Sequence, residues 1–405
     1  MLKEVRIQNY KSIQKLKLEL GRVTVLIGEN GCGKSNILEA IALASAAADD
    51  KLDNEFLASR GIRVTEPRLM RSAFEKENLD KEIKIDIKGH DGEDFSCVLH
   101  NDNSPYSQWI NKNNTNSITS LQNQVQQQQD VFNVYKVILS LDDSTTILSV
   151  IESLEKLSPQ DNDVLKDLVV GILKLKLETL KLKFYSLKEA TIYSPENQAL
   201  RTFEKEGQIQ PLGINGEGLF KLINVLNADN PDKLDQIKEK LRLIDWFKDF
   251  EIPQNLSAMQ TSLQITDRYL DTDLSYFDQR SSNEGFLFLL FYFTLFISEL
   301  TPKFFAIDNI DASLNPRLCR RLIEELVELA KKNDKQVILT THNPAVLDGL
   351  DLDDDEQRLL VISRNQLGYT KARRILNPEP LDGQEPVDLS EAFLRGYIGG
   401  LPKNF

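Results

Sequence analysis

The stretch Gly28-Glu-Asn-Gly-Cys-Gly-Lys-Ser35 matches the phosphate-binding pattern G-x-x-x-x-G-K-S at every fixed position. It follows an apolar segment, Val23–Ile27, that predicts a buried strand, and it precedes a helical pattern over residues 34–48. The glycines let the backbone curl so that successive N–H groups converge on phosphate oxygens. This context predicts a phosphate loop. The residues expected to bind the nucleotide are Gly28, Glu29, Asn30, Gly31, Cys32, Gly33, Lys34, Ser35 and Asn36.

Two side chains of this loop have distinct expected roles. Lys34 would reach the terminal phosphates of a nucleoside triphosphate, and the Ser35 hydroxyl would hold Mg²⁺. ATP and Mg²⁺ are therefore the predicted cofactors. The alternative is a glycine-rich turn with a chance lysine, and the flanking strand and helix make that alternative much less favoured.

Two later segments predict strands that end in polar side chains. The run KFFAID at residues 303–308 is apolar and ends in Asp308, which would hold Mg²⁺ from the side opposite Ser35. Gln336–Thr341 predicts another strand, and His342 follows it. Open parallel sheets place their ligands at the carboxyl ends of strands. Asp308 and His342 are therefore candidate catalytic residues beside Lys34, although a lone histidine is more often structural.

Several segments resemble one family of ATPases. LKEVRIQNYKSI at residues 2–13 resembles the first strand of RecF- and SMC-like ABC ATPases. That family includes the overcoming-lysogenization-defect nucleases and many ATPases of bacterial anti-phage systems. GINGEGL at residues 213–219 is similar to a glycine-bearing turn of these proteins, and RSSNEGFLFLL at residues 280–290 lies where their signature motif lies. LRGYIGGLPKNF at residues 394–405 is similar to the tail of some of them, whereas segment 61–189 shows no resemblance.

The resemblance assigns nucleotide contacts to the signature residues Ser282, Asn283 and Gly285. The family usually has a serine two residues before this glycine. Here Asn283 stands there, and Ser281 or Ser282 would have to supply the hydroxyl. The family also usually has glutamate directly after the magnesium-binding aspartate, where this chain has Asn309. Asparagine can hydrogen-bond a water but cannot accept its proton, so a slow or regulated ATPase is expected.

Asn309 still counts among the candidate catalytic residues. Asp311 is an alternative base, although its place resembles the D-loop of the family. In such ATPases the signature motif caps the nucleotide held by a second protomer. The resemblance therefore implies a homodimer or higher oligomer that closes around ATP and opens when the γ-phosphate is hydrolysed.

The composition is typical of a folded protein. Hydrophobic residues make up 41% of the 405 residues and charged residues 27%. Three scattered cysteines are too few for a disulfide framework or a zinc site. The N-terminus has no secretory pattern, and the longest apolar run, residues 285–297, is too short to span a bilayer. We therefore expect a cytoplasmic protein with no membrane partner.

The charge of the chain bears on nucleic-acid binding. A net charge of -13 disfavours DNA binding by the whole surface, because phosphate contacts need clustered lysines and arginines. A local basic patch on one lysine-rich segment remains an alternative, and a solvated helical face is the favoured interpretation of Lys174, Lys176, Lys181, Lys183 and Lys188.

These features predict an α/β fold of the ABC-ATPase head type. We expect a mixed N-terminal sheet, a central parallel sheet flanked by helices, and a helical insertion. The insertion is expected because leucines at helical spacing follow an Asn- and Gln-rich segment. The predicted domains are an N-terminal lobe (1–100), a polar loop with the helical insertion (101–189), a C-terminal lobe (190–370) and a tail (371–405).

Two classes of function remain. The first is an ATPase that senses or regulates a separately encoded effector, a nuclease or toxin, in anti-phage defence. The second is a DNA-repair or chromosome-associated ATPase that clamps DNA directly. The residues after His342 carry no recognisable nuclease motif. The acidic balance and the lack of long coiled-coil arms favour the first class.

Overall fold

The first three strands enter two different sheets. β1 (Leu2–Tyr10) and β2 (Ile13–Glu19) form an antiparallel hairpin, in whose turn Lys11 has a positive φ of 43°. β3 (Val23–Ile27) leaves this hairpin and joins the second sheet. The computed structural model describes residues 1–90, 94–113, 187, 189–202, 211–253, 262–271, 273–377 and 387–401.

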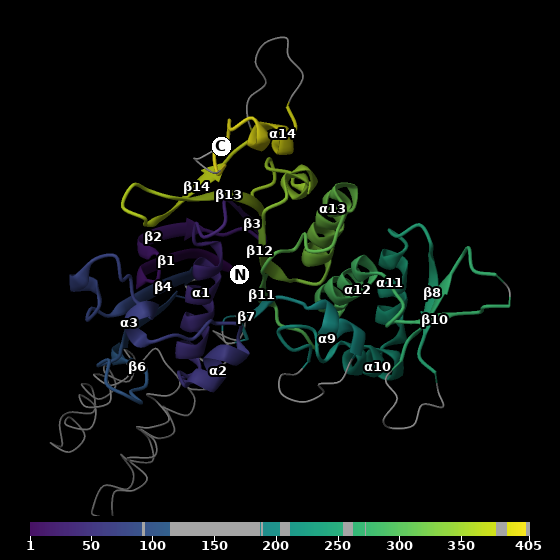
Figure 1. Cartoon of the computed structure of the whole chain (residues 1–405), viewed down its shortest axis with the longest axis horizontal. Coiled ribbons are helices and arrows are strands. Elements are labelled where there is room, and N and C mark those ends of the chain that lie inside the picture. Colours follow the sequence, from purple (N-terminus) through teal and green to yellow (C-terminus); the bar gives the residue numbers. More distant parts are fainter. Residues whose placement is uncertain are drawn as a thin grey trace, which may run out of the picture.

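A five-stranded sheet, in the order β2-β1-β4-β5-β6, forms one side of the molecule (Figure 1). Its other strands are β4 (Ile83–Gly89), β5 (Asp94–His100) and β6 (Ile110–Asn111). Every pairing is antiparallel, so this is not the mixed N-terminal sheet that we expected. The reason is that the short connections from β1 to β2 and from β4 to β5 join antiparallel neighbours only.

The second sheet is the central one, with the order β14-β13-β3-β12-β11-β7. Its neighbours are parallel except at β14, which runs antiparallel to β13 at the edge. Its strands come from both sides of the predicted insertion, which lies almost wholly outside the described residues together with its lysine-rich segment. The strands besides β3 are β7 (Thr191–Tyr193), β11 (Phe304–Ile307), β12 (Gln336–Thr341), β13 (Gln357–Arg364) and β14 (Thr370–Ile375).

Helices cover both faces of the central sheet (Figure 1). α1 (Lys34–Ala48) has the predicted bounds and packs between this sheet and the five-stranded one. A three-stranded antiparallel sheet, in the order β10-β9-β8, lies beyond the helices of the opposite face. The remaining elements are α2 (Asn54–Ser59), α3 (Pro67–Met70), η1 (Lys76–Asn78), α9 (Asn197–Thr202), α10 (Leu219–Asp229), α11 (Pro231–Leu241), β8 (Phe247–Glu251), β9 (Gln264–Asp267), β10 (Phe277–Asp278), α12 (Glu284–Ile297), α13 (Pro316–Lys332), η3 (Pro344–Gly349) and α14 (Leu389–Leu394).

The two faces of the central sheet belong to two hydrophobic cores. Val23, Val25 and Ile27 of β3 belong to the core that includes α10 to α13, whereas Leu26 belongs to the core with α1 and the five-stranded sheet. Because both faces are covered, every residue of β3 is buried, which explains why four of its five residues are apolar. Thr24 is the exception, and its hydroxyl accepts a 3.0 Å hydrogen bond from the N–H of Gly21. None of the described helices combines the length and the apolar character that a membrane crossing requires.

Candidate nucleotide-binding site

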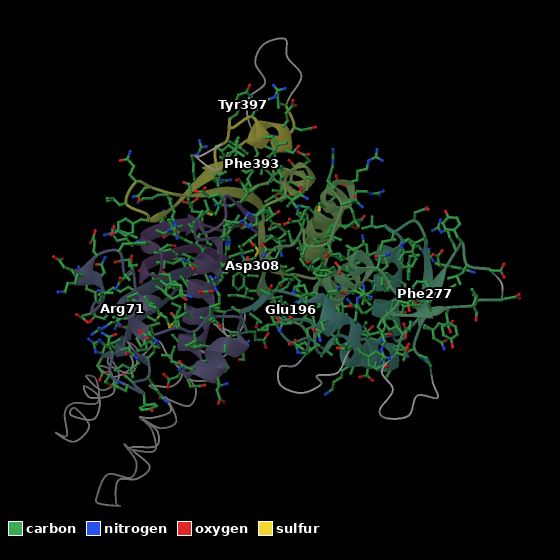
Figure 2. The ribbon with its side chains drawn as sticks, in the orientation of Figure 1. Arg71, Glu196, Phe277, Asp308, Phe393 and Tyr397 are labelled. Atoms are coloured by element: carbon green, nitrogen blue, oxygen red, sulfur yellow. The ribbon has the colours of Figure 1, made fainter. Side chains whose placement is uncertain are left out.

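Three functional segments meet at one edge of the central sheet. β3, β12 and β11 are parallel neighbours, so the residues that follow them emerge at the same carboxyl edge. The phosphate loop (residues 28–33) follows β3, Asp308 follows β11 and His342 follows β12. Figure 2 shows Asp308 in the middle of the molecule. The order of the strands thus brings together segments that are far apart in the sequence.

The phosphate loop has the backbone of an anion-binding turn. Gly31 and Gly33 have positive φ angles of 74° and 109°, a conformation that favours glycine. A Cβ at Gly33 would lie 2.1 Å from the hydroxyl oxygen of Thr370, whereas a Cβ at Gly31 would meet none of the described atoms within 4 Å. α1 begins after the loop with neither a side-chain cap nor an acidic residue in its first turn. Its first N–H groups have no intrahelical acceptor, so the loop fits a phosphate group.

Lys34 is buried, and its ammonium lies against the backbone of its own loop. Nζ donates to the carbonyl oxygens of Gly28 at 2.8 Å and of Glu29 at 3.2 Å. It also lies 3.4 Å from Nδ1 of His342. Burial lowers the pKa of Lys34, and the nearby carboxylate of Asp308 acts in the opposite direction. A bound phosphate would offset the free-energy cost of holding this cation in a buried position.

Ser35 and Asp308 face each other across the site. Ser35 Oγ donates a 2.9 Å hydrogen bond to one carboxylate oxygen of Asp308, and Thr340 donates to the other. A hydroxyl and a carboxylate in this arrangement are the hard oxygen ligands that Mg²⁺ takes in nucleotide sites. Thr340 thus joins the candidate site, although no motif indicated it. The one available signal was a hydroxyl near the carboxyl end of an apolar strand.

The chain turns sharply directly after Asp308. Asn309 has a positive φ of 58°, its N–H donates to Thr340 Oγ1 at 2.9 Å, and its side chain is exposed. Asparagine adopts this left-handed conformation more readily than glutamate does, so the residue found here suits the local backbone. Asp311 accepts a 2.6 Å hydrogen bond from the hydroxyl of Thr341. One carboxylate oxygen of Asp311, the alternative general base, therefore already accepts a hydrogen bond.

His342 lies beside Lys34 at the carboxyl end of β12. Partial burial and the positive charge of Lys34 lower the pKa of the imidazole from its ordinary value of about 6.5. The ring is therefore neutral at pH 7, with one nitrogen that donates and one that accepts a hydrogen bond. These properties suit a side chain that contacts a phosphate oxygen next to the ammonium of Lys34.

A chain of polar groups braces the phosphate loop from behind. Asn36 Nδ2 donates to Ser12 Oγ at 2.7 Å, and the hydroxyl oxygens of Ser12 and Thr370 are 2.6 Å apart. Thr370 in turn donates to the carbonyl oxygen of Cys32 at 2.9 Å. Cys32 itself is buried, and burial raises the pKa of its thiol, which disfavours a nucleophilic role. The phosphate-loop motif includes neither Ser12 nor Thr370, and the family-like segment at residues 2–13 gave no role for Ser12.

The predicted signature residues lie at the beginning of α12. The side-chain oxygen of Asn283 caps this helix by accepting a 2.9 Å hydrogen bond from the backbone N–H three residues later. The hydroxyl of Ser282 is buried and has no hydrogen-bond partner among the described residues. Gly285 lies in the first turn, and the neighbouring Glu284 accepts a 2.6 Å hydrogen bond from Ser313. Within the described part of the chain, no hydrogen bond or ion pair joins these signature residues to the phosphate loop.

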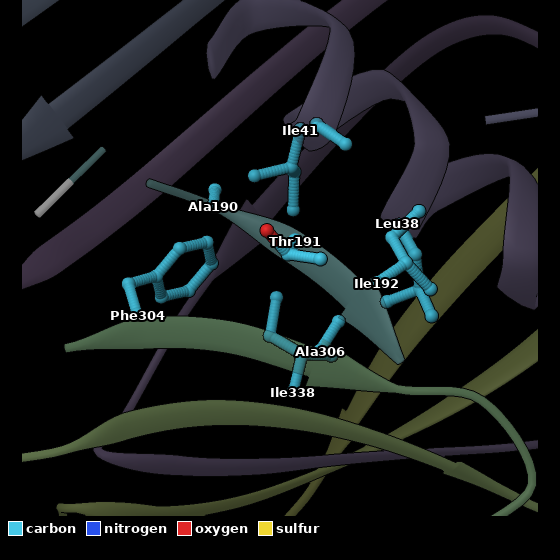
Figure 3. A pocket seen from close by; sticks show the side chains of 9 residues that line it. Leu38, Ile41, Ala190, Thr191, Ile192, Phe304, Ala306 and Ile338 are labelled. Atoms are coloured by element: carbon cyan, nitrogen blue, oxygen red, sulfur yellow. The ribbon is translucent and has the colours of Figure 1, made fainter. Parts of the chain in front are cut away.

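A small pocket elsewhere in the structure lacks the chemistry of a nucleotide site. It lies between α1 and the strands β7, β11 and β12 (Figure 3). Phosphate binding needs N–H donors and cations. The lining has no ionisable side chain and is apolar apart from Thr191: Leu38, Ile41, Ala42, Ala190, Ile192, Phe304, Ala306 and Ile338. The carboxyl edge of the sheet is therefore the candidate nucleotide site.

Two known proteins match this chain locally in sequence. An uncharacterized protein of Methanocaldococcus jannaschii is 31% identical over 119 residues, which cover 28% of this chain and 51% of that protein. The DNA replication and repair protein RecF of Bacillus cereus strain B4264 is 36% identical over 55 residues, or 13% of this chain and 15% of RecF. The chain thus spans about half of the first relative's length and much less of the second's.

A solved structure and a family model cover far more of the chain. The crystal structure of an SMC head bound to the C-winged helix domain of ScpA aligns over 93% of this chain and 98% of that chain, with a TM-score of 0.53 and 14% identity. At this identity the likeness establishes the fold alone. The family described as "AAA domain, putative AbiEii toxin, Type IV TA system" matches residues 23–348. We conclude that the chain belongs to this AAA-domain family and has the fold of an SMC head.

Proposed function

We propose that this protein binds ATP with Mg²⁺ at the phosphate loop and hydrolyses ATP slowly. The observation that carries the proposal is the meeting of Lys34, Ser35 and Asp308 at one edge of the central sheet. Lys34 would bind the terminal phosphates, and Ser35 and Asp308 would hold the ion. Bound Mg²⁺ would neutralise charge on the phosphate oxygens. His342, 3.4 Å from Lys34, is the candidate contact to the γ-phosphate.

Replacing Asn309 by glutamate tests the slow turnover. We expect Asn309→Glu to raise steady-state phosphate release about tenfold or more, because a carboxylate accepts the proton of the attacking water and such help is typically worth about a hundredfold. The left-handed backbone costs the new side chain about 1 kcal/mol. Asn309→Gln is the matched control, because glutamine has the same length without the basicity. A rapid wild type that neither variant alters would contradict the slow-ATPase proposal and favour Asp311 as the base.

In the proposed function, two copies close head to tail around ATP. Two observations support this arrangement. Ser282, Asn283 and Gly285 make no described hydrogen bond to the phosphate loop of their own chain, and they lie at a helix N-terminus, which favours anions. The family resemblance implies that such residues serve the nucleotide of a second protomer.

Gly285 offers a direct test of this closure. Outside its own helical turn, a Cβ at this position would come no closer than 3.5 Å to any described atom, so Gly285→Asp should fold normally. The new carboxylate would repel the phosphates of the partner's nucleotide. We expect ATP-dependent dimerisation, measured by light scattering, to be lost while ATP affinity in calorimetry stays nearly unchanged. Gly285→Ala should still dimerise. An ATP-driven dimer of Gly285→Asp, or a monomeric wild type with bound ATP, would contradict the head-to-tail arrangement.

A separately encoded effector, a nuclease or toxin of an anti-phage system, is the partner in this proposal. The family description names a putative toxin of a type IV system, and the solved SMC head is bound to another protein. Both support an ATPase that works with a partner. We expect the product of an adjacent gene to co-purify with the ATP-bound wild type and less with Lys34→Ala. Equal recovery of the partner with the wild type and with Lys34→Ala would mean that partner binding does not depend on bound ATP.

The second candidate is a DNA-repair or chromosome-associated ATPase that clamps DNA. The local match to RecF favours it, and the net charge of -13 speaks against it. Titration of duplex DNA with and without ATP, at low and high salt, separates the two functions. ATP-dependent and strongly salt-sensitive binding would support the clamp, whereas the effector-regulating ATPase is expected to bind DNA weakly or not at all.

A further inference from the structure

The segment after α14 lies against the back of the phosphate loop. A Cβ at Gly400 would lie 3.7 Å from the Cα of Gly28, the first glycine of the loop. It would also lie 2.9 Å from Val361 Cγ1 and 3.0 Å from Phe393 Cε2. Figure 2 shows Phe393 of α14 and Tyr397 of the following segment above the central sheet. We call residues 396–401 the tail clamp.

The tail clamp is fixed to the body of the protein at several points. Ile398 of the tail clamp and Phe393 of the preceding α14 are buried in the core that includes α10 to α13. The N–H of Ser390, in the first turn of α14, donates a 2.8 Å hydrogen bond to Asp348 in η3. The guanidinium of Arg373 on β14 donates to the carbonyl oxygen of Ile398. These contacts hold the tail clamp both to the edge of the central sheet and to η3, the segment that follows His342.

Gly28 is enclosed between the tail clamp and the sheet. A Cβ at Gly28 would lie 2.1 Å from the carbonyl oxygen of Ile362 on β13, and Gly400 covers it from the tail clamp. The carbonyl oxygen of Gly28 accepts the 2.8 Å hydrogen bond from Lys34 Nζ. The same Lys34 Nζ lies 3.4 Å from Nδ1 of His342. The position of Gly28 therefore bears on both the ammonium and the imidazole of the nucleotide site.

From these contacts we infer that the tail clamp is a positioning element of the nucleotide site. It holds Gly28 at the place where the carbonyl oxygen orients Lys34, and it connects the loop through α14 to the segment that follows His342. Gly400 is the central residue, because its neighbours leave no room for a side chain and its φ of 89° favours glycine. The inference rests on the proposed binding of ATP at this loop.

Two glycines of the tail clamp make a matched pair of variants. Gly396 and Gly400 both have positive φ, at 77° and 89°, so alanine imposes a similar backbone cost at either place. Among the described residues, a Cβ at Gly396 would meet only Leu401 Cδ1, at 3.7 Å, whereas a Cβ at Gly400 would clash with Val361 and Phe393. Gly396→Ala thus reports backbone strain alone, and Gly400→Ala adds displacement of the tail clamp from Gly28.

We expect Gly400→Ala to weaken ATP binding about tenfold in calorimetry, because overpacking shifts the backbone and a displacement of about 1 Å is costly at a positioned site. Hydrogen exchange of residues 28–35 should accelerate in the same variant without nucleotide. Gly396→Ala should match the wild type in both measurements. Equal affinity and equal exchange in the two variants would overturn the inference.

A second variant keeps the test decisive if Gly400→Ala does not fold. Arg373 is exposed, so Arg373→Ala should fold while it frees the tail clamp at Ile398. We expect faster exchange of residues 28–35 and weaker ATP binding in this variant too, and unchanged values of both would overturn the inference. A folded wild type that binds no ATP would instead refute the proposed function. Hydrogen exchange of residues 28–35, compared between the variants without nucleotide, would still test whether the contact between Gly400 and Gly28 orders the loop.

Discussion

Lys34→Ala is expected to weaken ATP binding by at least about a hundredfold, because hydrogen bonds to charged partners are worth about 1.5–3 kcal/mol each and the ammonium would make more than one. The fold should survive. Burial lowers the pKa of Lys34, so the folded protein holds the charged form at a cost, and its removal should cost little stability. Calorimetry with ATP and Mg²⁺ measures the affinity, and thermal unfolding with and without ATP gives a second readout.

Lys221→Ala is a suitable control for this experiment. Lys221 is an exposed residue of α10, where alanine is a good helix former, so this variant should bind ATP as the wild type does. The melting temperature of both the wild type and Lys221→Ala should rise on addition of ATP, and that of Lys34→Ala should not. Full ATP affinity in a folded Lys34→Ala protein would mean that the nucleotide site lies elsewhere.

Asp308→Ala should remove the dependence of nucleotide binding on Mg²⁺ and abolish hydrolysis. In the structure one carboxylate oxygen accepts from Ser35 at 2.9 Å and the other from Thr340, so the side chain is aimed into the site. Without the carboxylate, Mg²⁺ would lose its protein-borne negative charge while the phosphates remain unneutralised. We expect wild-type affinity for ATP to fall when Mg²⁺ is removed with a chelator, and the affinity of the variant to be low in both conditions.

Asp308→Asn is the matched variant, because it removes the negative charge of the side chain and keeps nearly the same shape. Its amide oxygen can still accept from Ser35 or Thr340, so the local packing should survive, but the negative charge is gone. We expect it to behave like Asp308→Ala in the magnesium titration and to be closer to the wild type in thermal stability. A Mg²⁺-dependent affinity that persists in both variants would show that Asp308 is not the ligand of the ion.

The parts of the candidate site that could be predicted are those marked by a pattern within a few consecutive residues of the sequence. The phosphate loop was predictable because its function depends on the spacing of glycines, Lys34 and Ser35 over a few consecutive residues. Asp308 and His342 were predictable because each follows a short apolar run of the kind that forms a buried parallel strand. The antiparallel pairing of β1 with β4 was not, because β2, β3 and α1 lie between these two strands in the sequence.

The sequence by itself predicted an α/β fold with a phosphate-loop motif after one strand, an aspartate at the end of a second strand and a histidine after a third. Only the tertiary structure decided which residues support them. The hydroxyl of Thr340 braces Asp308 from 32 positions away, and Ser12 and Thr370 meet behind the loop across 358 positions. Gly400 packs on Gly28 because β13 and β14 bring the tail clamp to the loop. Such contacts depend on the order of strands in the sheet, and the local periodicity of a sequence does not encode that order.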